Sequence, residues 1–315
     1  MAIQDCVWSD LFDDQARNTL QRGFVITGTI SVILSGWLTL TIFFTNLRFN
    51  LSYRNLACFT AVACVRRAMP MLSYLLFANY NDSWHDMQTF SCEFFAFWET
   101  FLAVYEVESL THVCIERYVV AKYITKGWVI PKRHYLMFQC LCLLLAGLYS
   151  FPPVFGLGRY GPDFACTSCT FDMTLPDTWQ RYFIISIFLL RSVKPALFMI
   201  MMLMWTRNLE DNFTSSVKTI KHLRFTQSVI AVTFMNLACW SPIAVLRGWV
   251  VLLFALYNDV QIESHAYVQW AMWLHWVSPA VTAVSVFLID DTIRHKMINM
   301  HSDDIETDEE EKKNE

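Results

Sequence analysis

The chain has 315 residues, of which 55% are hydrophobic and only 17% are charged, and its mean hydropathy is +0.34. An ordinary soluble domain carries roughly 25% charged residues, so this composition excludes a water-soluble enzyme. The formal net charge of −4 says little about partners, because acidic residues gather in a C-terminal tail that water solvates.

Seven apolar stretches are each long enough to cross, as a helix, a hydrocarbon layer about 30 Å thick. In chain order they cover residues 24–44, 56–77, 94–115, 135–157, 182–205, 225–257 and 266–289. Strands of a membrane barrel alternate in polarity over about ten residues, and none of these stretches alternates. The sequence therefore predicts an all-α membrane protein, a seven-transmembrane helix bundle that forms one domain over residues 24–289.

The loops and termini predict how the bundle is oriented. Eleven Lys and Arg residues lie in the loops on one side and four in those on the other. Because basic loops stay in the cytoplasm, residues 1–23 are expected outside the cell and residues 290–315 inside it. Residues 290–300 are expected to form a short cytoplasmic amphipathic helix before the acidic tail. The predicted location is the lipid bilayer of the plasma membrane, crossed several times, with the N-terminus outside.

Four sequence motifs lie at particular positions along these stretches. They are Glu116-Arg117-Tyr118 after the third stretch, with Cys92 at its other end; the loop Gly158-Arg159-Tyr160-Gly161-Pro162-Asp163, followed by Cys166 and Cys169; Pro195 in the fifth stretch; and Cys239-Trp240-Ser241-Pro242 in the sixth. Together they resemble the rhodopsin-like (class A) family of G-protein-coupled receptors, and the loop resembles that of opsins. The resemblance covers about residues 24–297.

The resemblance implies a heterotrimeric G protein as partner, coupled through Glu116, Arg117 and Tyr118. In the family, the arginine exchanges its glutamate for a backbone group of the G protein when the receptor opens. The resemblance also implies a disulfide bond between Cys92 and Cys169, which lie on the expected outer, oxidising side. Such a bond would attach the outer loop to the third helix, so that the loop forms a lid over the outer end of the bundle.

Among the departures from the opsin pattern, two bear directly on the expected function. Where opsins have a glutamate that locks the arginine at rest, this chain has His222, so the lock is expected to be weak or pH-sensitive. Opsins also hold retinal on a lysine of the seventh helix, but no lysine occurs between Ala255 and Asp291. Depending on the alignment, Met272 or Trp276 takes its position. We therefore expect no retinal Schiff base and predict no cofactor.

Eight ionised side chains lie at membrane depth: Arg66, Arg67, Glu99, Glu106, Glu108, Arg191, Lys194 and Arg247. Each would cost roughly 2.5 to 3.5 kcal/mol if it faced lipid, so most are expected to face the interior and to pair. At about 100° per residue, Glu99, Glu106 and Arg117 share one face of the third helix, and Glu108 points the opposite way.

Arg191 and Arg247 match positions that line the ligand cavity in many members of the family. We expect them to bind the anion of a small anionic or zwitterionic ligand, and Glu99 to bind any amine. The residues expected to complete this cavity are Trp240, Met272 and Trp276. The alternative is a purely structural ion network, in which Arg66 pairs with Glu99 or Glu106.

The leading functional hypothesis is an opsin-like receptor that answers a small chemical ligand through a G protein. A photoreceptor that holds retinal non-covalently remains an alternative, and so does a proton or solute transporter that uses the buried carboxylates and His112. A transporter predicts paired inverted repeats, which the sequence lacks. No phosphate-binding glycine loop, nucleophile elbow or metal-ligand cluster occurs, so we predict neither an enzyme nor a metal site. The basic loops are too small for nucleic acid.

Overall fold

The computed structural model describes residues 8, 11–77, 89–123, 126, 130–164, 169–173, 178–211, 213, 217–257 and 265–298. The helices in this part are α1 (Asp14–Phe44), η3 (Asn46–Phe49), α2 (Leu51–Phe77), α3 (Thr89–Tyr123), α4 (Lys132–Ser150), η5 (Pro152–Phe155), α5 (Thr178–Phe188), η6 (Leu189–Val193), α6 (Lys194–Glu210), α7 (Val217–Tyr257), α8 (His265–Ile289) and α9 (Asp291–Ile298). Because α5, η6 and α6 join end to end, the long described helices form the seven rods that the sequence predicts.

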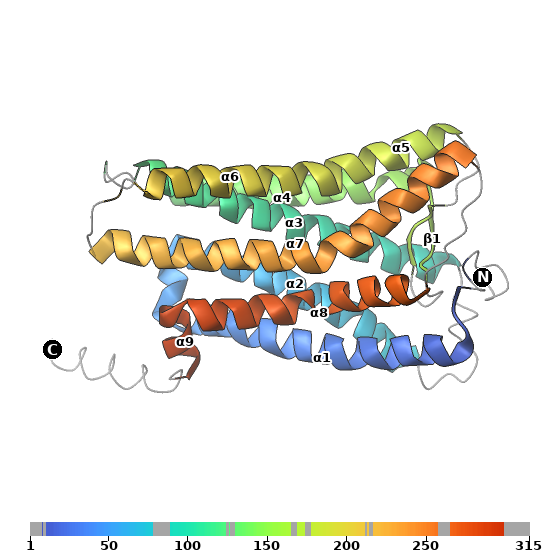
Figure 1. The fold of residues 1–315 in the computed structure, drawn as a ribbon, viewed down its shortest axis with the longest axis horizontal. Helices are drawn as coiled ribbons and strands as arrows, with labels where there is room; N and C mark the ends of the chain where they lie inside the picture. The colour runs from blue at the N-terminus through green and yellow to red at the C-terminus, as the bar shows by residue number, and fades with distance from the viewer. Residues whose placement is uncertain are drawn as a thin grey trace.

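The rods run side by side along the long axis of the molecule (Figure 1). α1 packs against α2 and α8, α8 packs against α7, and α3 packs against α2, α4 and α6. The start of α1 and the end of α8 lie at opposite ends of the bundle, as an odd number of crossings requires. Four described segments are long and apolar enough to span a membrane by length and composition: Gln15–Phe44, Trp179–Glu210, His222–Phe254 and Ala266–Ile289.

Most of the helices extend beyond the apolar stretches, and two of the ends that differ have a clear physical cause. α1 begins at Asp14, ten residues before the first stretch, because the carboxylate of Asp13 caps it by accepting a backbone hydrogen bond from its first turn. α4 ends at Ser150, so the prediction that the fourth helix continues to residue 157 is wrong. Pro152 and Pro153 have no backbone N–H, and the chain turns there into the short 3-10 helix η5.

α9 is the short amphipathic helix predicted after the last span. Its cap is Asp290, which accepts hydrogen bonds from the backbone N of Ile293 at 3.0 Å and from the Tyr53 hydroxyl at 3.1 Å. Burial raises the pKa of the Asp290 carboxyl. The side chains of Ile293 and Met297 are buried against the bundle. The expected acidic tail, residues 299–315, lies outside the described residues.

A short antiparallel hairpin, β1 (Tyr160–Pro162) and β2 (Cys169–Phe171), covers one end of the bundle and packs against α3 (Figure 1). Cys169 is disulfide-bonded. The side chain of Cys92 and all of Cys166 lie outside the described part of the chain, so the bond from Cys92 to Cys169 stays a prediction. We call the hairpin end of the bundle the outer end and the α9 end the inner end.

The interior has two apolar clusters separated by a polar layer. The outer cluster lies beneath the hairpin and the inner cluster lies toward α9. Along α3, the outer cluster includes Ala96 and the inner cluster includes Leu110, and buried Glu106 lies between them. Arg66 of α2 and His275 of α8 are buried at the same level. Such a layer is stable only if its polar groups pair with one another.

Candidate functional site

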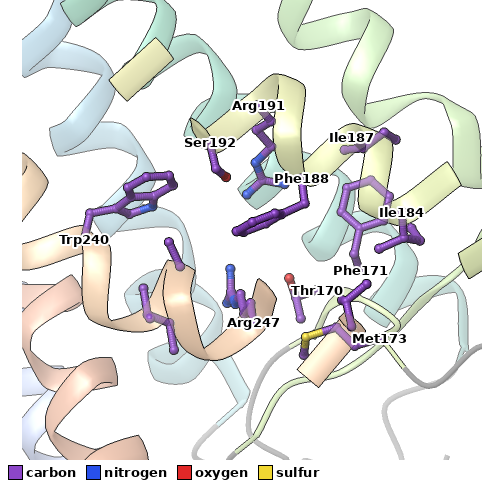
Figure 2. Close-up of a pocket in the computed structure, with 13 residues that line it drawn as sticks. Thr170, Phe171, Met173, Ile184, Ile187, Phe188, Arg191, Ser192, Trp240 and Arg247 are labelled. Carbon is purple, nitrogen blue, oxygen red and sulfur yellow. The ribbon is translucent and has the colours of Figure 1, made fainter. Parts of the chain in front are cut away.

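The candidate site is a cavity beneath the hairpin, between the α5–α6 rod and α7 (Figure 2). Its volume is about 60 Å³, enough for about four water molecules. The residues that line it are Thr170, Phe171, Met173, Ile184, Ile187, Phe188, Arg191, Ser192, Trp240, Ile243, Ala244, Arg247 and Val251. Most of this wall is apolar, and its two ionised groups are Arg191 and Arg247.

A π-helical turn carries Arg191. This turn, η6, ends two residues before Pro195, which has no N–H for the regular helical bond to the carbonyl oxygen of residue 191. Wide turns of this kind occur often at functional sites. Arg247 comes from α7, five residues after Pro242. Figure 2 shows both guanidinium groups pointing into the space between the two helices.

Neither arginine has a carboxylate partner within the described part of the chain. Nε of Arg247 is buried without a hydrogen-bond partner, and the Arg191 guanidinium lies 6.0 Å from the ring centroid of Phe171. The charges of Asp163 and Glu99 attract Arg247 from beyond ion-pair distance. Because two partly buried cations share one small space and repel each other, the cavity favours an anion.

Of the remaining arginines at membrane depth, Arg66 pairs with carboxylates, whereas Arg67 donates to a backbone oxygen and its Nε is buried without a hydrogen-bond partner. Arg66 donates from Nε to Glu99 Oε1 and from Nη1 to Glu106 Oε2, both at 2.8 Å. Its Nη2 lies 2.9 Å from Nε2 of His275, whose backbone oxygen accepts a hydrogen bond from Arg67 at 2.5 Å. The ion network expected as the alternative for these residues is therefore present, with both glutamates. Glu99 keeps 30% of its side chain exposed.

The other residues expected in the ligand cavity have different positions. Trp240 lines it, whereas Met272 is buried in the outer cluster. Trp276 faces α1, where its ring centroid lies 4.3 Å from that of Phe24. Neither Met272 nor Trp276 is among the lining residues. The opposite face of α3 carries Glu108, as expected, and its carboxylate accepts a hydrogen bond from the Lys194 side chain at 3.3 Å.

Phe188, whose ring forms part of the cavity wall, is not predicted by the sequence. A Cβ atom built on Gly248 would lie 2.8 Å from this ring, so the ring can occupy its place only because residue 248 has no side chain. Phe188 is one of many apolar residues in its stretch, and no local signal marks it. Ser192 could have been found from its place beside Arg191.

At the inner end, Glu116 and Arg117 form a buried ion pair. Arg117 Nη2 donates to Ser52 Oγ at 2.5 Å, and Glu116 Oε2 accepts from Asn55 Nδ2 at 3.0 Å. Tyr118, the third residue of the motif, packs its ring against α6. These contacts keep the arginine within its own chain, so a partner would have to displace them.

His222 does not face Arg117. Its Nε2 lies 3.1 Å from Oε1 of Glu210 at the inner end of α6, and both side chains are buried. Arg117 instead lies 4.6 Å from the ring centroid of Phe225 on α7. α7 therefore meets α6 through the contact between His222 and Glu210, and α3 through a cation–π contact. The pH dependence of this region stays a prediction.

Comparison with known proteins agrees with this architecture. Residues 54–282 match the family described as 7 transmembrane receptor (rhodopsin family). Rhodopsin, GQ-coupled, from Mizuhopecten yessoensis is 23% identical over 267 residues, which are 79% of this chain and 49% of that protein, so the chain spans about half the length of this relative. The crystal structure of squid rhodopsin has the same fold, with a TM-score of 0.78 and 15% identity over 91% of this chain and 85% of that one. The chain belongs to the rhodopsin family of seven-transmembrane receptors, which are multi-pass membrane proteins and not enzymes.

Proposed function

We propose that this chain is a G-protein-coupled receptor that answers a small anionic ligand bound between Arg191 and Arg247. The observation that carries the proposal is this pair of cations in one small cavity, without a carboxylate partner among the described residues. A carboxylate or phosphate can accept paired N–H bonds from a guanidinium and neutralise it. A zwitterionic ligand would in addition find Glu99, which is partly exposed although it pairs with Arg66.

We propose further that the receptor forms no retinal Schiff base. α8 contains no lysine. A cavity of about 60 Å³ is small beside the roughly 300 to 1,000 Å³ of pockets for drug-sized ligands. Retinal is an apolar polyene and offers nothing to neutralise two guanidinium groups. The residues of this site therefore do not fit that group.

The proposed signal passes along α7. An anion would draw η6 and α7 together at the outer end, and α7 can bend at Pro242 because a proline leaves a backbone carbonyl without its helical partner. Arg247 lies on one side of this bend, and His222 lies on the other. Movement at the outer end would thus change the contact between His222 and Glu210 at the inner end.

The proposed partner at the inner end is a heterotrimeric G protein, which would take Arg117 from Glu116. The relative from Mizuhopecten yessoensis is named as Gq-coupled, so a G protein of that class is the first to test. In this arrangement the receptor lies in the plasma membrane with residues 1–23 outside and residues 290–315 in the cytoplasm.

The test is a G-protein activation assay in cells that express the full chain. Pools of carboxylates, phosphates and zwitterions are applied in darkness, and light is applied after retinal has been added. Arg247→Ala should raise the half-maximal concentration of an active anion about a hundredfold, because it removes one of the two cations that are proposed to bind the anion. Arg22→Ala, at an exposed position of α1 near the outer end, should change nothing.

Surface expression of each variant decides how the result is interpreted. If Arg247→Ala is not expressed at the surface, Arg247 has a structural role and the ligand site is in error. Retinal that stays attached through borohydride reduction and denaturation would overturn the proposal that the receptor works without a Schiff base.

A further inference from the structure

Arg67 of α2 and His275 of α8 form a buried polar contact that the proposed ligand site does not use. The two residues keep only 2% and 6% of their surface exposed. Nη2 of the Arg67 guanidinium donates to the backbone oxygen of His275 at 2.5 Å. Neither residue is among those that line the cavity of Arg191 and Arg247. We call the contact of Arg67 with His275 the α2–α8 site.

Arg67 carries a full positive charge without a carboxylate partner in the described part of the chain. The nearby glutamates of α3 donate no proton and accept from Arg66 instead. Nε of Arg67 is buried, and no described acceptor lies within hydrogen-bond distance of it. Burying a cation is strongly unfavourable unless a counter-charge is hydrogen-bonded to it. A negative group beside Arg67 would therefore stabilise the bundle.

His275 adds a second buried donor to the α2–α8 site. Its Nε2 lies 2.9 Å from Nη2 of Arg66. A guanidinium can only donate, so Nε2 accepts and the proton of the neutral ring lies on Nδ1. Nδ1 is buried too, and it has no acceptor among the described residues. The two unused donors thus belong to residues in direct contact, and both need an acceptor.

The surrounding charges favour an anion over water at this position. The charges of four arginines act on the His275 ring, namely Arg66, Arg67, Arg191 and Arg247. Three carboxylates of the described chain act on these arginines in turn, namely Glu99, Glu106 and Asp163. One positive charge is left in excess. A water molecule would bring no charge and two further protons that need acceptors, whereas a halide ion only accepts.

We propose that the α2–α8 site binds one chloride ion. Nε of Arg67 and Nδ1 of His275 donate to the ion, and the ion supplies the counter-charge that Arg67 lacks. Because both residues are almost completely buried, the anion must be small, which excludes organic carboxylates and phosphates. The ion joins α2 to α8, and its binding depends neither on the ligand nor on the G protein proposed above.

The test measures thermal unfolding of the purified full chain in a neutral detergent, while chloride replaces gluconate at a constant ionic strength of about 0.15 M. Only the folded chain has the site, so the unfolding temperature should rise with chloride concentration and yield an apparent dissociation constant. The rise should reach about 5 °C when chloride is at roughly a hundred times that constant.

Variants at Arg67 separate a bound ion from a general effect of charge. Arg67→Gln removes the charge, so the apparent dissociation constant for chloride should rise at least about fiftyfold. Arg67→Lys keeps the charge but loses the planar fork of donors, so the constant should rise only about tenfold. The matched control is Lys194→Gln, which removes a cation at membrane depth from the separate pair with Glu108. It should bind chloride within about threefold of the unchanged chain.

Three outcomes would overturn the proposal. Equal unfolding temperatures in chloride and in gluconate would mean that water satisfies the two donors. Equal loss of the chloride effect in Arg67→Gln and Lys194→Gln would mean that the chain responds to overall charge. A loss in Arg247→Gln without a loss in Arg67→Gln would place the ion in the ligand cavity and leave the proposed function standing. If Arg67→Gln does not fold, Arg67→Lys decides, and an unchanged dissociation constant there would equally contradict the site.

Discussion

Gly248 determines how close the α5–α6 rod can come to α7 beside the cavity. The Phe188 ring lies against its backbone, at a distance where a methyl group would be 2.8 Å from two ring atoms. The same ring lines the cavity with Arg191 and Arg247. Gly248, which has no side chain, thus sets the position of the Phe188 ring and with it the space between the two arginines.

Gly248→Ala should therefore weaken the response to an anionic ligand about tenfold, because the ring must move and overpacking of this kind costs about 1–3 kcal/mol. The measurement is the half-maximal ligand concentration in the G-protein assay, together with the thermal unfolding temperature of the purified chain. Gly23→Ala in α1 is the control, since nothing lies within 4 Å of a Cβ atom there. An unchanged response in Gly248→Ala would show that Phe188 does not shape the site.

At the scale of the helices, the inner end of α7 is held by contacts that the sequence motif did not reveal. His222 and Glu210 join α7 to α6. Arg207 lies 3.6 Å from the same carboxylate, one turn earlier on α6. Since α7 also carries Arg247 at its other end, we expect the contact between His222 and Glu210 to oppose the motion that ligand binding is proposed to cause.

Glu210→Gln should raise ligand-independent G-protein activation about threefold, because an amide keeps the shape of the side chain but loses the carboxylate that faces His222, a change worth roughly 0.7 kcal/mol. The control is Asp211→Asn, which removes the same charge at the next, exposed position. Basal activity is measured at equal surface expression. If Glu210→Gln and Asp211→Asn behave alike, the contact between His222 and Glu210 does not restrain α7.

For the whole molecule, the sequence predicts the number and order of the helices well, because long apolar runs have few alternatives in lipid. The end of α4 is misplaced because the apolar run continues past Pro152 and Pro153, where the helix itself ends. The sequence identifies Arg191, Arg247 and Trp240 as cavity residues through their positions in the family. It does not find Phe188 or the partner of His222, because both depend on contacts between distant helices.

The polar layer joins the two halves of the bundle. Arg66 of α2 binds two glutamates of α3, and its third nitrogen meets His275 of α8. Arg66, Glu106 and His275 are buried between the outer and inner apolar clusters, and Glu99 keeps part of its side chain exposed. The free energy of the layer therefore depends on every member having its partner.

Arg66→Leu should lower the free energy of unfolding by about 3–5 kcal/mol, because it leaves Glu99 and Glu106 without their counter-charge. The measurement is thermal or denaturant unfolding of the purified chain in detergent, compared with Arg22→Leu at an exposed position of α1. Adding Glu99→Gln and Glu106→Gln to Arg66→Leu should recover part of the loss, since neutral amides need no cation and contacting residues are not additive. A triple variant less stable than Arg66→Leu alone would mean that the glutamates stabilise the bundle through groups other than Arg66.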